Sequence, residues 1–432
     1  MQAFDTYIQQ HQDQFIDELK TFCAQPSISA TGEGIEEMAA MVRQKMEELG
    51  ASVQMLTVGP DEPQVVYASL GNGDKTLLIY NHYDVQPVDP LHLWHSPPFE
   101  PTIRDGNIYG RGVSDNKGNL LYRIQAIRAW QAVVGPLPFK INWFIEGEVE
   151  TGSPHLEPFC LTNRHLLRAD GCLWEMGNVD EAGRPVLSLG AKGLLYVELS
   201  VQTMAGDQHS AMGTLAPNAA WRLNWALNSL KAPDETILIE GLMDYVTPPS
   251  PADIELLQAI PFEEAAMLAD LGIDRWVGGV SGFEALKRHL FQPTCTICGI
   301  ESGYTGPGQK TVLPARAMAK VGFRLVPDLT PEIVAGLLRQ HLDKHGFEDI
   351  ELKVLGGEHP GRSDPAAAVV QAAIAAARRA YPDHEPVVYP LVAGTGPVWP
   401  VAVAHGTPLV SFGASYPGQN LHAPNENVRL AD

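Results

Sequence analysis

The sequence predicts an α/β protein, with a mixed sheet flanked by helices and a chain long enough for two domains. Short apolar runs alternate along the chain with segments of helical periodicity, as in sheets covered by helices. Acidic residues and histidines follow several of the apolar runs, where such sheets usually form their sites. At 432 residues, the chain is also long enough for two separate hydrophobic cores.

Two amphipathic helices are expected first. Phe15, Leu19 and Phe22 are spaced i, i+4, i+7 and form one apolar helix face. A second apolar stripe occupies residues 35–49 and stops at Gly50, a residue type that often follows the last turn of a helix. We therefore expect each segment to be a helix with one buried face.

Apolar strands follow these helices. Residues 65–70 and 76–80 are predicted to form a strand pair around an Asn-Gly turn. After them we expect a helix at 116–134 and a buried strand at 139–145, which leads into the acidic stretch EGEVETGS.

The rest of the chain predicts a second domain and a return to the first. Residues 185–193 look like a crossing between domains. The further expected elements are strands at 194–202, 311–313, 317–326, 350–355 and 409–412, helices at 218–230, 331–345 and 366–380, and a mostly helical stretch at 240–292.

The composition argues against several classes of protein. A net charge of −21 argues against nucleic acid or an anionic membrane as a partner, although an acidic soluble surface explains the same charge. No apolar run approaches the length of a membrane span, and the first residues show no signal peptide. The five scattered cysteines, an odd number, indicate a reducing compartment, so we expect a cytoplasmic protein.

Two imidazoles and three carboxylates at or after strand ends are candidate metal ligands: His82, Asp115, Glu150, Glu175 and His422. This donor set suits a pair of divalent ions with a bridging carboxylate, and it lacks the thiolates of a structural zinc site. Asp84, two residues after the first histidine, shares its face of the strand and can hold its second ring nitrogen. Taken singly, each candidate ligand is also explained as a helix cap, a solvated loop acid or a loop histidine.

The chain resembles the superfamily of zinc-dependent aminoacylases, carboxypeptidase G and carnosine dipeptidases, and is most similar to its dipeptidase branch. The resemblance runs from Phe15 to Glu426 through the stretches NHYDVQPVD, GRGVSDNKG, EGEVETGS, ADGCLWE, DQHSAMGT, GPGQKTVLPARAMAKVGFRLVP, AGTGP and HAPNEN. It implies that a metal-bound hydroxide cleaves the amide bond of a dipeptide or an N-acyl amino acid. The implied cofactors are two divalent ions, zinc first, with manganese or cobalt also suited to these ligands.

The resemblance further implies roles for individual residues. The implied ligands are His82 and Glu175 for the first metal, Glu150 and His422 for the second, and Asp115 as the bridge, with Asp84 supporting the first histidine. The resemblance also implies that a smaller α/β domain, residues 191–357, is inserted into a catalytic domain of residues 1–190 and 358–432. The inserted domain would form a lid that makes a homodimer, and its His209 would reach the partner's active site and stabilise the oxyanion. Arg324 would hold a substrate carboxylate, or else be an exposed strand charge, and Gly394 and Thr395 of AGTGP would contact the substrate.

One departure from the family concerns catalysis. Relatives carry paired glutamates before x-G-S, and the first of them is the general base; here that position is Val149, which cannot transfer a proton. Glu148, one residue earlier, would point to the opposite side on an extended backbone, but a loop or bulge could turn it inward. Glu148 is therefore either a substitute base or a solvated loop acid. The chain also stops at Asp432, where relatives continue into a terminal helix.

Three functions remain open at this stage. The leading one is a dipeptidase-like metallohydrolase, which could also act on an ester or an activated amide. The second, motivated by Val149, is a metal-dependent protein that binds an amino acid or dipeptide without cleaving it. The third is different metal chemistry on a related scaffold.

Overall fold

The computed structural model describes residues 2–59, 62–413 and 415–431. The chain forms two compact units, which are described separately. Unit 1 comprises Met1–Gly190, Arg362–Pro390 and Pro397–Asp432, and unit 2 comprises Ala191–Gly361 and Leu391–Gly396. Across the described ranges, no helix combines the length and apolar character needed to cross a lipid bilayer.

Unit 1 contains the first and the last elements of the chain. Its helices and 3-10 turns are α1 (Gln2–Ala24), α2 (Ile35–Glu48), η1 (Leu91–Leu93), α3 (Lys117–Val133), η2 (Val149–Thr151), α4 (Leu156–Thr162), α5 (Arg164–Leu167), α11 (Ala368–Ala380), α12 (Val398–Val401) and η6 (Val403–His405). Its strands are β1 (Ser52–Thr57), β2 (Gln64–Leu70), β3 (Thr76–His82), β4 (Thr102–Arg104), β5 (Asn107–Tyr109), β6 (Lys140–Glu146), β7 (Gly171–Trp174), β8 (Asn178–Val179), β9 (Pro185–Ser188), β18 (Val387–Tyr389), β19 (Leu409–Ser411) and β20 (Asn427–Arg429).

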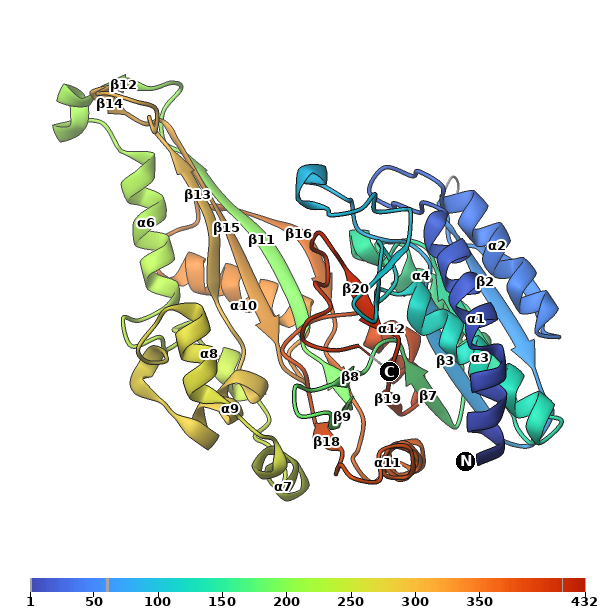
Figure 1. The fold of residues 1–432 in the computed structure, drawn as a ribbon. Helices are drawn as coiled ribbons and strands as arrows, with labels where there is room; N and C mark the ends of the chain where they lie inside the picture. The colour runs from blue at the N-terminus through green and yellow to red at the C-terminus, as the bar shows by residue number, and fades with distance from the viewer. Residues whose placement is uncertain (1, 60–61, 414, 432) are drawn as a thin grey trace. The chain divides into compact units, whose positions relative to one another are not determined.

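A nine-stranded mixed sheet is the centre of unit 1 (Figure 1). Its strand order is β1-β2-β6-β3-β7-β19-β9-β18, and β8 pairs with β9 off this path. The central strands β6, β3, β7 and β19 run parallel to one another, whereas β1, β2 and β6 pair antiparallel. The carboxyl ends of the four parallel strands therefore lie at one edge of the sheet, which is where sites form in α/β folds.

Helices cover both faces of this sheet, as the fold class predicted. Trp143 and Ile145 of β6 belong to a buried cluster shared with α1, α2 and α3. Phe144, between them, contacts the ring of Phe159 in α4, with 6.2 Å between ring centroids. Because successive strand residues point to opposite faces, α4 lies on the other side of the sheet from the first three helices.

The predicted pairing of the two early strands is wrong, although both strands form. β6 lies between them, antiparallel to β2 and parallel to β3. Because β6 pairs along both of its edges, it is an interior strand, and all of its residues after the first are buried. The glycine turn is therefore a crossover loop: Gly71 has φ +75°, and a Cβ there would lie 2.3 Å from the carbonyl oxygen of Phe139.

Unit 2 is a smaller α/β unit. Its strands are β11 (Gly193–Gln202), β12 (Gln208–His209), β13 (Thr296–Ser302), β14 (Val312–Leu313), β15 (Arg316–Leu325) and β16 (Glu351–Glu358). Its helices and 3-10 turns are η3 (Ser210–Thr214), α6 (Ala219–Leu230), η4 (Leu242–Tyr245), α7 (Pro251–Ala259), α8 (Glu264–Leu271), η5 (Val277–Gly279), α9 (Gly282–Phe291) and α10 (Pro331–Lys344). The short strands β10 (Gly190–Ala191) and β17 (Gly361–Arg362) occur where the chain passes between units.

An antiparallel sheet of order β13-β15-β11-β16 organises unit 2 (Figure 1). Alternate residues of β11, from Leu195 to Val201, are buried in one cluster with side chains of α6 and α10. The edge strand β13 is exposed along almost its entire length. The helices thus cover one face of the sheet, and the core of unit 2 lies between them and that face.

Candidate active site

Three neighbouring strands of unit 1 bring polar side chains to the same edge of the sheet. His82 is the last residue of β3, and its partner in the parallel ladder is Glu146, the last residue of β6. Glu150 lies in η2, shortly after β6, and Glu175 directly follows β7. Because β3, β6 and β7 are parallel neighbours, the residues at and after their carboxyl ends come together.

Asp115 reaches the same edge from the loop before α3, and a buried acid holds that loop in place. The backbone N–H of Asp115 donates to Glu426 Oε1 at 3.0 Å. The other donors to the Glu426 carboxylate are Gly112 N at 3.0 Å, Ser114 N at 2.9 Å and Arg111 Nη1 at 2.8 Å. No role was expected for Glu426 from the sequence. Its place in the HAPNEN stretch, four residues after His422, was the feature that could have indicated a role near the site.

Two imidazoles share the carboxylate of Asp115. His82 Nε2 lies 3.1 Å from Oδ1, and His422 Nε2 lies 2.9 Å from Oδ2. Each imidazole also has an acid of its own: Glu175 Oε2 is 3.3 Å from His82 Nε2, and Glu150 Oε2 is 3.3 Å from His422 Nε2. The five residues predicted as ligands therefore converge, in two halves that meet at Asp115.

Asp84 connects the two halves. Its Oδ1 lies 3.1 Å from His82 Nδ1, and its Oδ2 accepts a hydrogen bond from the backbone N–H of Glu150 at 3.0 Å. A carboxylate at the second ring nitrogen orients the imidazole, so Nε2 is turned toward Asp115. Gln86 Nε2 donates to Glu150 Oε2 at 2.9 Å and holds the second half.

The charges in this group shift one another strongly. Burial opposes protonation of His82, but Glu175, Asp115 and Asp84 outweigh it and raise its pKa well above the ordinary value. Hydrogen bonds with Asp115 and Glu150 raise the pKa of His422 to about 10. Burial alone would raise the pKa of Asp115, but the two imidazoles lower it. Burial raises the pKa of Glu175 to about 7, against the charge of His82.

The residues present fit divalent metal ions. Glu150 Oε1 and Glu175 Oε2 are buried and make no hydrogen bond within the described residues, although Glu175 Oε2 lies in an ion pair with His82. Ligand atoms of His82, Asp115 and Glu150 all lie within 4.8 Å of one another. A buried carboxylate oxygen without a donor is costly, and a cation satisfies it. Imidazole and carboxylate together are the donors that zinc, manganese and cobalt accept.

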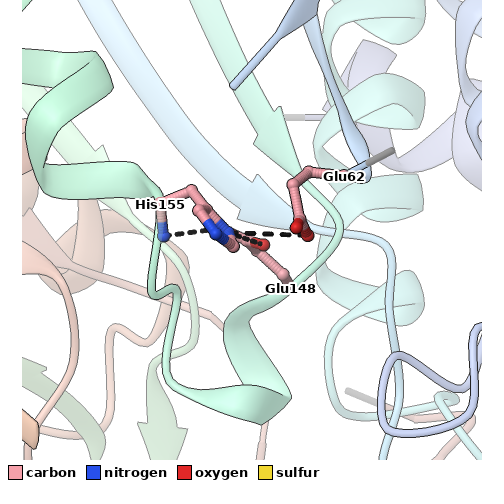
Figure 2. A group of neighbouring side chains, drawn as sticks. All are labelled: Glu62, Glu148 and His155. Atoms are coloured by element: carbon pink, nitrogen blue, oxygen red, sulfur yellow. Dashed lines mark hydrogen bonds and ion pairs between the residues drawn. The ribbon is translucent and has the colours of Figure 1, made fainter. Parts of the chain in front are cut away.

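Glu148 contacts a different group of side chains, shown in Figure 2. Its Oε1 accepts a hydrogen bond from the backbone N–H of His155 at 3.1 Å, and its Oε2 lies 3.1 Å from His155 Nδ1. Glu62 Oε2 lies 3.5 Å from the same nitrogen. Glu148 is only 5% exposed, so it is not a solvated loop acid.

Val149 is half-buried at the start of η2 and carries no group that transfers a proton. The remaining acid of this stretch is Glu146, which is buried beside Tyr80 and accepts a hydrogen bond from Ser153 Oγ at 2.9 Å. Burial raises the pKa of Glu146 to about 8. The three acids of EGEVETGS thus have three different environments.

The other predicted site residues lie in unit 2. His209 is exposed at the end of β12, and its Nδ1 accepts a hydrogen bond from Ala211 N at 3.1 Å. Arg324, on β15, donates through Nη1 to Thr395 Oγ1. Apart from Gly394 itself and its two chain neighbours, none of the described residues has an atom within 4 Å of the position that a Cβ at residue 394 would take. The structure therefore brings Arg324 and Thr395 into direct contact.

A helix-flanked mixed sheet that gathers imidazoles and carboxylates at the ends of its parallel strands is suited to metal-dependent hydrolysis. Residues 78–432 match Peptidase family M20/M25/M40, and the chain belongs to this family. The resemblance stated from the motifs is thereby confirmed, and the chain is a hydrolase of the metallopeptidase class.

Individual relatives cover most of the chain. It is 29% identical to Beta-Ala-His dipeptidase of Mus musculus over 379 residues, covering 82% of this chain and 77% of the relative. It is 30% identical to Cys-Gly metallodipeptidase dug1 of Schizosaccharomyces pombe over 358 residues, covering 78% and 74%. The M20 family metallo-carboxypeptidase Sso-CP2 from Sulfolobus solfataricus has a similar structure, with a TM-score of 0.90, 39% identity, and 96% and 95% of the two chains covered.

Proposed function

We propose that the protein is a dinuclear metal-dependent hydrolase that cleaves the amide bond of dipeptides or N-acyl amino acids. The observation that carries the proposal is the position of Asp115 between His82 and His422. Two imidazoles that share one carboxylate, each with an acid of its own, provide two ligand sets with a common member. The names of the relatives, Beta-Ala-His dipeptidase and Cys-Gly metallodipeptidase, support dipeptides as substrates.

Five side chains would hold the two ions: His82 and Glu175 in one half, Glu150 and His422 in the other, and Asp115 in both. Zinc is the first choice, and manganese and cobalt are alternatives that accept the same donors. Two such ions, when bound, lower the pKa of water and polarise a carbonyl oxygen. Asp84 would keep the first imidazole oriented for binding through its contact with Nδ1.

Arg324 would recognise the carboxylate of the substrate. Its guanidinium donates to Thr395 Oγ1, and that hydroxyl donates to the carbonyl of Gly193 at 3.2 Å, which orients the pair. A guanidinium matches the planar geometry of a carboxylate and can donate two parallel hydrogen bonds to it. The open space at Gly394 would let a substrate approach the backbone beside this pair.

Glu148 is our proposal for the group that takes up the proton of the attacking water. The carboxylate is buried but bound to His155, so it has to leave that partner before it can act. A positioned side-chain base contributes about 10²–10⁴-fold in rate. Because Glu148 is bound to His155, it supplies only part of this factor, and we expect slow cleavage of peptides and faster cleavage of an ester or an activated amide.

We infer that unit 2 acts as a lid, corresponding to the inserted domain expected at residues 191–357, and that it forms a homodimer. The exposed imidazole of His209 supports this, because it is accessible to a second subunit. There it would stabilise the developing oxyanion. We also place the protein in the cytoplasm, since its five cysteines are unpaired.

The alternative function is a metal-dependent protein that binds an amino acid or dipeptide without cleaving it. Val149 favours this alternative, because the residue at the expected base position has no proton-transfer group. Both functions use the same ligands and the same carboxylate recognition, so only turnover separates them.

Turnover on a dipeptide panel tests the proposal, with protein loaded with zinc, manganese or cobalt and products identified by mass spectrometry. We expect slow hydrolysis by the wild type, a decrease for Glu148→Gln, and an increase of about 10²–10⁴-fold for Val149→Glu. Glu181→Gln, at an exposed acid of unit 1, is the control and should change nothing.

An inert wild type with an active Val149→Glu variant would instead support the binding protein. Unchanged turnover in Glu148→Gln would exclude that residue as the base. Products other than the hydrolysed dipeptide would indicate a different reaction on the same scaffold.

A further inference from the structure

Unit 2 contains a large cavity in addition to the group of ligands in unit 1. Its volume is about 1070 Å³, at the upper end of the range typical of small-molecule sites. The cavity is lined by residues of α8, η5 and α9, by the segment that leads into β13, and by Arg324 near the end of β15. A carboxylate-recognising side chain therefore shares a cavity with a helical part of unit 2 that has no assigned role.

Apolar side chains gather on the helical wall of this cavity. Among them are Phe262, Met267, Leu271, Trp276 and Val277. Leu271 and Val277 are each 61% exposed, and Met267 is 41% exposed. Scattered exposed apolar residues are ordinary on a protein surface, but a group that lines one cavity indicates a binding site.

Two aromatic residues of this wall are held in place. The rings of Phe262 and Trp276 are 6.3 Å apart between centroids, and Trp276 Nε1 donates to Glu264 Oε1 at 2.8 Å. The same carboxylate accepts from the backbone N–H of Gly282 at 3.0 Å through its second oxygen. The apolar wall is therefore formed before a ligand arrives, which lowers the entropic cost of binding.

The lining also contains cationic side chains, Lys192 and Arg324 among them. Lys192 is 1% exposed, and its Nζ donates to the carbonyls of His289 at 2.7 Å and Gln292 at 2.6 Å. Arg324 donates to the hydroxyl of Thr395. No ion pair joins either cation to a carboxylate in the part of the chain that the structure describes.

Most of the acids in the lining already have partners. Glu235 pairs with Lys231, and Glu284 pairs with Lys287. Asp234 accepts a hydrogen bond from the backbone N–H of Thr236 at 3.0 Å. The positive charges of Lys192 and Arg324 thus favour an anion from outside unit 2.

One further acid, Glu358, interacts with Arg324 through its charge. Burial raises the pKa of Glu358 to about 7, although Arg324 opposes this shift. No ion pair joins Glu358 to Arg324 within the described ranges, and one oxygen of Glu358 has no hydrogen-bond partner there, so this carboxylate does not hold the guanidinium.

We propose that this cavity binds the side chain of the substrate's carboxyl-terminal residue, whose carboxylate pairs with Arg324. The cavity would thereby select substrates in which that side chain is large and apolar. The ligand class is an α-carboxylate with an aromatic or branched aliphatic side chain. The proposal rests on the proposed function for the role of that residue in the reaction, but the binding itself does not require hydrolysis.

Calorimetric binding of free L-phenylalanine and glycine to the metal-loaded protein tests the proposal. We expect phenylalanine to bind at least about tenfold more tightly than glycine, because only its ring fills the apolar wall. Leu271→Asp should remove this preference, measured as the ratio of the two affinities in the same variant, because the charged side chain spoils the apolar wall. Ile8→Asp, at an exposed apolar residue of α1 in unit 1, is the matched control and should behave as wild type.

Arg324→Met should weaken both amino acids, because it removes the charge that holds the shared carboxylate. Equal affinities of the wild type for phenylalanine and glycine, no binding of phenylalanine, or an intact preference in Leu271→Asp would each overturn the proposal. If the protein prefers phenylalanine but hydrolyses no dipeptide, the result would support binding of the apolar side chain in this cavity and would refute the proposed function instead.

Discussion

Asp115 Oδ1 lies 3.1 Å from His82 Nε2, and the second oxygen of the same carboxylate faces another imidazole. In the absence of metal, each imidazole can share a proton with this carboxylate at the place that a cation would take. The raised pKa values of His82 and His422 have this cause, because each imidazole gains acidic partners on folding. This relationship makes metal binding, proton release and stability parts of one equilibrium.

Metal binding should release protons. At pH 8 the His422 imidazole of the metal-free protein is protonated, since its pKa is about 10, and the raised pKa of His82 favours protonation of that imidazole as well. Binding of divalent ions should thus release at least one proton at pH 8 and fewer above pH 10. A pH-indicator dye in weakly buffered solution measures the release, and release that does not depend on pH would contradict this account.

The metal-free protein should lose stability as the pH rises. A group whose pKa is raised by folding stabilises the protein fully below its unfolded pKa, about 6.5 for histidine, and loses this contribution as the pH passes its folded pKa. For His422 the contribution should therefore fade between about pH 6.5 and 10. Thermal unfolding should show a falling Tm across this window without metal, and a much smaller change with metal bound.

Glu426→Gln should strongly destabilise unit 1. Glu426 and Arg111 are both about 1% exposed at their side chains, so the variant leaves a buried guanidinium without its counter-charge. Breaking such a pair costs about 3–5 kcal/mol. Urea unfolding measures the loss, and Glu385→Gln, in an exposed ion pair with Arg378, should unfold like the wild type. An unshifted midpoint for Glu426→Gln would mean that Glu426 does not hold the loop before α3.

His155→Ala should destabilise the protein, because it removes the imidazole beside Oε2 of the buried Glu148, while the backbone N–H of residue 155 still donates to Oε1. The hydrogen bond to Glu148 raises the pKa of His155, so the effect should be fully present below about pH 6.5 and shrink as the pH passes the folded pKa. Thermal unfolding at several pH values measures it, with the exposed His165→Ala as control. If Glu148 is the base, turnover should also change in His155→Ala.

Mixing two inactive variants tests the proposed action of His209 across a dimer. His209→Ala lacks the oxyanion residue, and Asp115→Asn lacks the shared ligand. If the imidazole acts on the site of the partner subunit, the mixed dimers contain one complete site, and an equal mixture should recover about a quarter of the wild-type activity. A mixture that stays inactive, although mass spectrometry shows mixed dimers, would contradict the exchange.

The candidate ligands could be identified from the sequence, because each follows an apolar strand or lies in a recognisable stretch. Parallel neighbouring strands end at the same edge, so His82, Glu150 and Glu175 meet once the sheet forms. The convergence of Asp115 and His422 depended on the resemblance to a family, since they are 307 residues apart.

Features that depend on distant contacts were not predictable from local patterns. β6 lies between β2 and β3 because it pairs with both of them, and such pairing with distant segments cannot be read from neighbouring residues. Glu426 holds the loop of Asp115 from a segment that reaches it only in the folded chain. The attachment of Glu148 to His155 likewise depends on the fold of the segment around η2, which the spacing of residues does not reveal.

The metal content of purified protein, dialysed against zinc and measured by atomic emission, tests the central claim most directly. We expect two zinc ions per chain for the wild type and for the exposed-site control Asp364→Asn, and a marked loss for Asp115→Asn, which removes a ligand from both halves. Two ions retained in Asp115→Asn, or none bound by the wild type, would contradict the shared-carboxylate site.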